Sequence, residues 1–136
     1  MQIDIRHGAH CDVLNIVVIS VLRGWIRSHV AIAVWVATPC ASWSRARHDL
    51  PDKGGPRSKE FIMGKPNLSE ADCRRVDIGN RTMDFSARLI SFCRRFNTPV
   101  VLENPWNDYL WLAAPIARQV SGQNATVVDF CQYGEK

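Results

Sequence analysis

The chain has 136 residues, of which 46% are hydrophobic, so it can form one domain with a buried core, and wholesale disorder is excluded. Seventeen Lys and Arg residues against thirteen Asp and Glu give a net charge of +4, which permits a polyanionic partner but does not require one. The longest apolar stretches are interrupted by Arg23, Arg27 and His29 well short of a membrane span, so no membrane association is expected.

The beginning of the chain carries a strand signal followed by a helix signal. Ile3 and Ile5 alternate with polar residues, which predicts a short strand. Apolar residues then recur at three- and four-residue steps over 13–28, which predicts a helix that Asp12 would cap.

A continuous apolar run and a long basic loop come next. Residues 30–37, VAIAVWVA, suit a strand that is covered on both faces, as in a parallel sheet. Pro39 ends this strand, because proline cannot serve an interior ladder. Residues 41–66 form a loop with two turn-forming Gly-Pro segments, and loops of this length are usually functional or disordered. Its basic residues are Arg45, Arg47, Lys53, Arg57, Lys59 and Lys65.

The second half of the chain alternates helix and strand. Apolar patterning predicts a helix, a strand, a helix and a strand over 71–96, 99–102, about 108–120 and 125–130. Ser69 and Asp72 resemble the start of a capping box for the first of these helices. Gly79 and Asn80 are a point at which that helix could divide.

This order of elements predicts an α/β fold with a doubly wound, mostly parallel sheet, in a single domain over 1–136. Ligands bind such sheets at the carboxyl ends of the strands. One strand end carries Cys40 and another carries Glu103 and Asn104, so parallel strands would bring these residues to the same edge. Arg45 and Arg47 would favour a thiolate and could bind phosphates, and the set suits covalent attack on a nucleobase.

The same residues resemble a known family. Residues 38–44, Thr-Pro-Cys-Ala-Ser-Trp-Ser, are similar to the Pro-Cys-x-x-Phe-Ser nucleophile motif of the DNA cytosine-5 methyltransferases. Residues 89–104 resemble the following helix and the strand that ends in Glu-Asn-Val in that family, although Pro105 stands here in place of the valine. The resemblance implies a Rossmann-like methyltransferase core, in a reduced or partial form.

The resemblance also implies a mechanism. Cys40 would attack C6 of a flipped-out cytosine in DNA, Glu103 would protonate N3, and S-adenosylmethionine would supply the methyl group to C5. The expected substrate-binding residues are Pro39, Ser42, Ser44, Arg45, Arg47 and Asn104. Asp4 resembles the acidic residue that binds the ribose hydroxyls of the cofactor, and Asp12 the aspartate near its adenine. Asp12 could equally be a plain helix cap. The family's glycine-rich Phe-x-Gly-x-Gly turn has no counterpart before Ile3.

The remaining cysteines and the histidines do not point to a metal. The five cysteines are widely spaced without a Cys-x-x-Cys pair, and the four histidines show no ligand spacing, so no metal site is expected. No signal peptide is visible, which favours reduced thiols and an intracellular protein, cytoplasmic or in the nucleoid or nucleus.

Two other functions stay open. The chain could be a catalytically inactive relative that binds DNA, or a protein that handles DNA, through the basic loop, with Cys40 a small buried residue. It could also be an oligomerising fragment whose open sheet edges are completed by a second copy or a partner chain.

Overall fold

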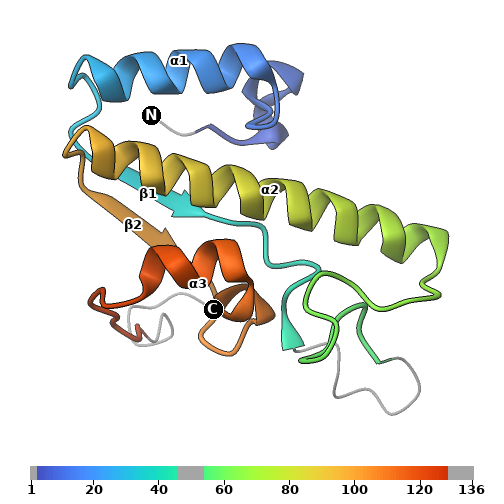
Figure 1. The fold of residues 1–136 in the computed structure, drawn as a ribbon. Helices are drawn as coiled ribbons and strands as arrows, with labels where there is room; N and C mark the ends of the chain where they lie inside the picture. Colours follow the sequence, from blue (N-terminus) through green and yellow to red (C-terminus); the bar gives the residue numbers. More distant parts are fainter. Residues whose placement is uncertain (1–2, 46–53, 129–136) are drawn as a thin grey trace.

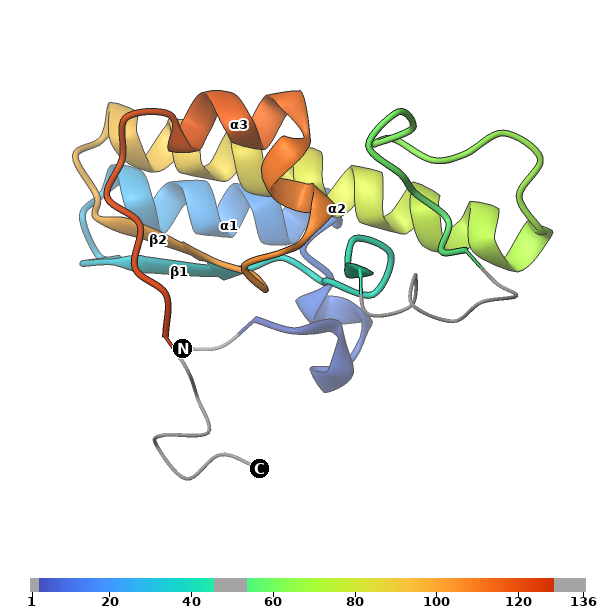
Figure 2. The ribbon, with the colours of Figure 1, turned by 90° about the horizontal axis from the view of Figure 1, so that it is seen from below.

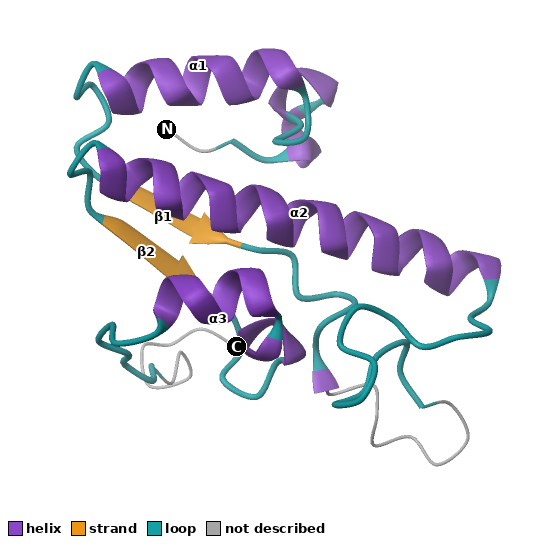
Figure 3. Cartoon of the chain, viewed as in Figure 1, coloured by secondary structure: helices purple, strands orange, loops and turns teal. Residues whose placement is uncertain are grey.

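The computed structural model describes residues 3–45 and 54–128, which form a mixed α/β structure (Figure 1). Its α-helices and strands are α1 (Ile16–Arg27), β1 (Val34–Ala37), α2 (Glu70–Arg95), β2 (Val100–Glu103) and α3 (Ala114–Val120). Short 3-10 helices accompany them in the described residues, among them η1 (Ile5–His7), η2 (Ala9–Cys11) and η4 (Tyr109–Leu112) (Figure 3). None of the helices in the described part of the chain is both long and apolar enough to cross a membrane.

The N-terminal segment differs from the prediction. The strand expected at Ile3 and Ile5 is wrong, because Asp4 caps η1 there by accepting a hydrogen bond from the backbone of Arg6 at 2.9 Å. The predicted helix over 13–28 is confirmed as α1, but Asn15 is its N-cap and accepts the N–H of Val17 at 2.8 Å. A short polar side chain that satisfies the local backbone outweighs a brief apolar alternation.

The sheet has two strands, β1 and β2, which pair in parallel from Val34 opposite Val100 to Ala37 opposite Glu103. Helix α2 makes the connection between them, as parallel neighbours require. All three helices lie on one side of the strands (Figure 2). Trp35 and Val101, which oppose each other in the sheet, are consequently exposed on the other face.

Helix α2 is continuous through Gly79 and Asn80, so the predicted division is wrong. Ser69 caps it by accepting the N–H of Asp72 at 3.2 Å, which confirms the predicted start. Along its exposed side four arginines each pair with an acid three or four residues earlier: Arg74, Arg75, Arg81 and Arg88. Such pairs support a helix from its own sequence, at about 0.2–0.5 kcal/mol each.

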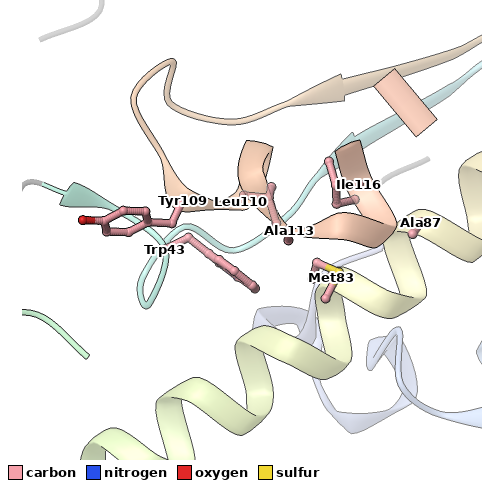
Figure 4. Packing of buried hydrophobic residues seen from close by; sticks show 7 residues of the cluster. All are labelled: Trp43, Met83, Ala87, Tyr109, Leu110, Ala113 and Ile116. Carbon is pink, nitrogen blue, oxygen red and sulfur yellow. The ribbon is translucent and has the colours of Figure 1, made fainter. Parts of the chain in front are cut away.

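Two apolar clusters hold the elements together. One joins α1, β1 and α2 through Ile26, Val36, Leu89 and Cys93. The other joins α2 to η4, α3 and the loop after β1, and its members are Trp43, Met83, Ala87, Tyr109, Leu110, Ala113 and Ile116 (Figure 4). Both clusters lie on the helix side of the sheet, so that side contains the core.

The C-terminal elements are shorter than predicted. The helix expected to about 120 is split into η4 and α3, because Pro115 in the first turn of α3 has no N–H with which to continue a preceding helix. Of the strand expected at 125–130, residues 125–128 are not in a strand and 129–130 lie outside the described residues.

Candidate active site at the ends of two strands

The ends of β1 and β2 bring together the residues that the sequence singled out. Ala37 lies opposite Glu103 in the parallel register, and Cys40 follows Ala37 by three positions. Asn104 links the two strand ends directly, because its Nδ2 donates to the backbone oxygen of Thr38 at 2.5 Å. The predicted meeting of the two strand ends at one edge is therefore confirmed. Cys40 is exposed there and Glu103 is partly exposed.

A tight turn presents Cys40. We call residues 38–45 the Cys40 turn. The backbone oxygen of Cys40 accepts the N–H of Trp43 at 2.9 Å and of Ser44 at 2.8 Å. A carbonyl that accepts two successive amides fixes the backbone on both sides of the cysteine. The thiol is thus exposed on a turn whose main chain is ordered from within.

The turn is attached to α2 by a pair of hydroxyls. The Ser86 hydroxyl donates to the backbone oxygen of Thr82 at 2.9 Å, as serines inside helices often do. Its oxygen lies 2.8 Å from Oγ1 of Thr38, which therefore acts as the donor in that pair. Thr38 and Ser86 are both buried. This hydrogen bond fixes the start of the turn to the middle of the long helix.

Arg57 makes the densest set of contacts in the site. A guanidinium has five N–H donors, and all five are used here on neutral oxygens. They go from Nε to Ser42 O at 3.0 Å, from Nη1 to Ile62 O at 2.6 Å and Asn80 Oδ1 at 2.9 Å, and from Nη2 to Ser42 Oγ at 3.0 Å and Val76 O at 3.2 Å. Arg57 is completely buried, and burial lowers its pKa to about 10, so it remains charged at neutral pH.

Trp43 completes this arrangement. The guanidinium carbon of Arg57 lies 3.4 Å from the centre of the Trp43 ring, a close cation–π stack. The ring is fully buried in the second apolar cluster and points toward Met83 of α2 (Figure 4). The backbone oxygen of Trp43 accepts the N–H of Tyr109 at 3.1 Å, which ties the turn to η4. The Cys40 turn is thus held from α2, from η4 and from Arg57.

Gly79 allows α2 to approach the turn. A Cβ at this position would lie 2.2 Å from Oγ of Ser42 and 2.9 Å from Nη2 of Arg57. Both distances are shorter than an ordinary van der Waals contact, so a larger residue would force the Ser42 hydroxyl and the Arg57 guanidinium to move. This explains a glycine inside a long helix, where it costs about 1 kcal/mol relative to alanine.

Arg45, the last residue of the Cys40 turn, and Asp108, the residue before η4, are further charged groups in this region. The Arg45 guanidinium stacks over the Tyr109 ring at 4.7 Å. Asp108 is only 2% exposed, and among the described residues neither of its carboxylate oxygens has a hydrogen-bond partner. Burial raises the pKa of Asp108 to about 6, although the charge of Arg45 acts in the opposite direction. Asp108, which the sequence places only at the start of a predicted helix, is therefore a titratable group of the site.

The predicted substrate-binding residues differ in how exposed they are to solvent. The hydroxyl of Ser42 is buried and bonded to Arg57, so it shapes the turn rather than facing solvent. Pro39 is exposed and Ser44 is partly buried beside Cys40. Arg47 lies outside the described residues. Arg57 of the basic loop is not available to bind a phosphate, because all five N–H donors of its guanidinium are already used within the protein.

The cofactor prediction finds little support in the described residues. Asp4 is bound by Arg6, whose hydrogen bonds lower the pKa of Asp4, and Asp12 accepts the N–H of Leu14 at 2.9 Å. A mainly apolar cleft of about 590 Å³ runs along β1, and among the described residues its lining includes the hydroxyls of Thr38, Thr82 and Ser86 but no charged side chain. Neither aspartate lines it. These residues alone do not fit S-adenosylmethionine, so its binding stays a prediction.

The sequence analysis missed Arg57, Gly79 and Asp108 as parts of the site. A glycine inside a helical pattern was the available signal, since it usually has a packing reason. Arg57 gave no such signal, because its surroundings in the sequence are those of any basic loop. In the described part of the chain, no three His, Cys, Asp or Glu residues lie close enough to hold a metal ion.

Comparisons with known proteins give no further guidance on function. The chain matches no protein-family model, and no curated protein sequence and no solved structure is significantly similar to it.

Proposed function

We propose that the chain is a cytosine-5 methyltransferase-like domain, in which Cys40 adds to C6 of a cytosine and Glu103 exchanges a proton with N3. One observation carries the proposal: the parallel register that places Ala37 opposite Glu103 joins the Pro-Cys turn and the Glu-Asn strand end at one edge. The β1-α2-β2 unit is also the repeating element of doubly wound sheets, which supports a partial Rossmann-like core.

The chemistry follows from the residues at this edge. The thiolate of Cys40 forms a bond to C6, and the electrons of the C5–C6 double bond shift to form a C4–C5 double bond. The electrons of the N3–C4 double bond move to N3, which takes a proton from Glu103. C5 thereby becomes nucleophilic and can accept an electrophile. When C5 accepts a proton from water and loses its original hydrogen, the thiolate leaves, N3 returns its proton, and the base is restored with an exchanged hydrogen.

Methyl transfer would require S-adenosylmethionine as the electrophile at C5. The described residues form no complete site for this cofactor, so we assign no step to it. Addition and exchange need only this chain and the base, which makes them the activity that the site can be tested for. The target nucleotide must be single-stranded or extruded from the duplex, because C6 is inaccessible within a base stack.

The test is exchange of the C5 hydrogen of cytosine for deuterium. A single-stranded oligonucleotide with one cytosine is incubated with the protein in D₂O, and mass spectrometry measures the gain of one mass unit per base. We expect exchange with the wild type, a large loss in Glu103→Gln and none in Cys40→Ser. Cys73→Ser is the control, because Cys73 is an exposed cysteine at the start of α2, away from the strand ends.

Exchange that persists in Cys40→Ser, or that is absent from the wild type, would contradict the proposal. The second candidate function is non-catalytic DNA binding by the same fold, and the incomplete cofactor site favours it. It predicts DNA binding that weakens steeply with salt, survives Cys40→Ser and is accompanied by no exchange.

A further inference from the structure

We propose that Arg57 is the positioning residue for Cys40: its buried guanidinium sets the conformation of the Cys40 turn and thereby the placement of the thiol toward a base. This role rests on the proposed function for its consequence in catalysis, but the structural part of it can be tested separately. The sequence gives Arg57 no such role, since it reads there as one of several loop cations.

Arg57 forms hydrogen bonds with the Cys40 turn at two atoms of Ser42. Its Nε and Nη2 donate to the backbone oxygen and to the hydroxyl of Ser42, both at 3.0 Å. Ser42 lies between Cys40 and the two amides that the Cys40 carbonyl accepts. A change in the position of Ser42 therefore alters the geometry on which the orientation of Cys40 depends.

Arg57 is itself held in place by hydrogen bonds to α2. Nη1 donates to Asn80 Oδ1 and Nη2 to the backbone oxygen of Val76, both in α2. Asn80 is held in turn, because its Nδ2 donates to the backbone oxygen of Met63 at 3.0 Å. The guanidinium thus connects the turn to the long helix that also carries the Thr38–Ser86 hydrogen bond.

The guanidinium of Arg57 is a buried positive charge. The oxygens that accept from Arg57 are all neutral. Burying a charge without a counter-ion is expensive, and here the five hydrogen bonds and the stack on the Trp43 ring compensate for the lost hydration. A guanidinium with five fixed donors can join five oxygens from distant segments in one plane, whereas an ammonium has three donors and no such fork. This geometric requirement accounts for an arginine here.

A positioning role and a phosphate-binding role of Arg57 predict different effects when the arginine is replaced. An arginine that contacts DNA would change the affinity for the oligonucleotide and its salt dependence when it is replaced. A positioning residue changes the rate of the chemical step instead, because the thiol is misplaced relative to the bound base. A displacement of about 1 Å at a reacting group can cost about 100-fold in rate.

The experiment compares Arg57→Lys and Ser42→Ala with the wild type. Arg81→Lys is the matched control, since Arg81 lies on the exposed side of α2, the helix that Arg57 contacts, in a 3.8 Å pair with Asp77. The first readout is amide hydrogen exchange at Trp43 and Ser44, whose N–H groups are bonded to the Cys40 carbonyl. We expect protection at these two amides to fall in both variants, while amides in the middle of α2 stay protected and show that the fold survives.

The second readout is C5 deuterium exchange of the oligonucleotide. We expect kcat to fall about 100-fold in Arg57→Lys and about tenfold in the milder Ser42→Ala, with KM and its salt dependence unchanged. Wild-type protection at Trp43 and Ser44 in both variants would overturn the proposal, as would a change confined to KM. If the wild type shows no C5 exchange, the proposed function fails, while the amide readout still decides whether Arg57 orders the turn. If Arg57→Lys does not fold, Ser42→Ala supplies both readouts.

Discussion

Gly79→Ala is the substitution whose outcome depends most directly on the close approach of α2 to the Cys40 turn. In an isolated helix this change is favourable by about 1 kcal/mol, because alanine has the higher helix propensity. In this protein the new Cβ would lie 2.2 Å from Oγ of Ser42 and 2.9 Å from Nη2 of Arg57. The serine hydroxyl has to move by about 1 Å, and its hydrogen bond to Arg57 is then lost.

The magnitude follows from these two effects. Overpacking of a well-filled site costs about 1–3 kcal/mol, and a hydrogen bond to a charged group contributes about 1.5–3 kcal/mol. After the gain in helix propensity, we expect the free energy of unfolding to fall by about 1.5–5 kcal/mol. That is a large share of the total for a small domain, which is typically about 5–15 kcal/mol.

The assay is urea unfolding followed by circular dichroism, with Gly24→Ala as the matched control. Gly24 lies in α1, where an added Cβ meets no atom within 4 Å, so alanine should stabilise the protein there by about 0.5–1 kcal/mol. Repeating Gly79→Ala in a Ser42→Ala background removes the closest clash and should recover about 1–2 kcal/mol of the loss. A Gly79→Ala protein as stable as Gly24→Ala would refute the close packing of turn and helix.

Two further predictions concern buried polar groups. Because burial raises the folded pKa of Asp108 from its ordinary value to about 6, its protonated form is the stabilising one, and this contribution is lost as the pH rises from about 4 through 6. Relative to Asp108→Asn, the wild type should lose about 2 kcal/mol of unfolding free energy between about pH 4 and pH 7. Urea unfolding across that range measures this loss, and parallel pH profiles of the two proteins would contradict the prediction. Asn104→Asp removes the donor to Thr38 O and should lower the free energy of unfolding by about 1–3 kcal/mol. Asn124→Asp, at an exposed position after α3, should change it little. Equal effects of the two substitutions in urea unfolding would show that the link between the strand ends contributes nothing.

Much of the site's framework could be predicted from the sequence. Two apolar runs separated by a long helical pattern require a crossover connection, and a crossover connection makes the strands parallel. The polar residues that follow each run then have to meet at one edge, as Ala37 and Glu103 do. The start of α2 at Ser69 was equally accessible, because capping depends on residues three positions apart.

Other features depend on which of two competing local interactions is stronger, and a sequence pattern does not show this. Ile3 and Ile5 alternate like a strand, but the Asp4 side chain satisfies the neighbouring backbone in a 3-10 turn, and in the described structure no strand lies beside this segment to pair with it. In the same way, Gly79 and Asn80 look like a break in a helix. The tertiary contacts of both residues, with Ser42 and with Arg57, make them part of its continuous core-facing side.

Only the tertiary structure decided which charged groups are buried and which atoms they contact. In the sequence Arg57 and Arg45 are two cations of one basic loop, and Asp108 is one of several polar residues before a helix. The acceptors of Arg57 come from Ser42, Ile62, Val76 and Asn80, which are separated by up to 38 positions and meet only in the folded chain. Burial and hydrogen-bond partners are properties of that meeting, so the sequence determined which strand ends carry the reactive residues, and the fold determined which charges hold them in place.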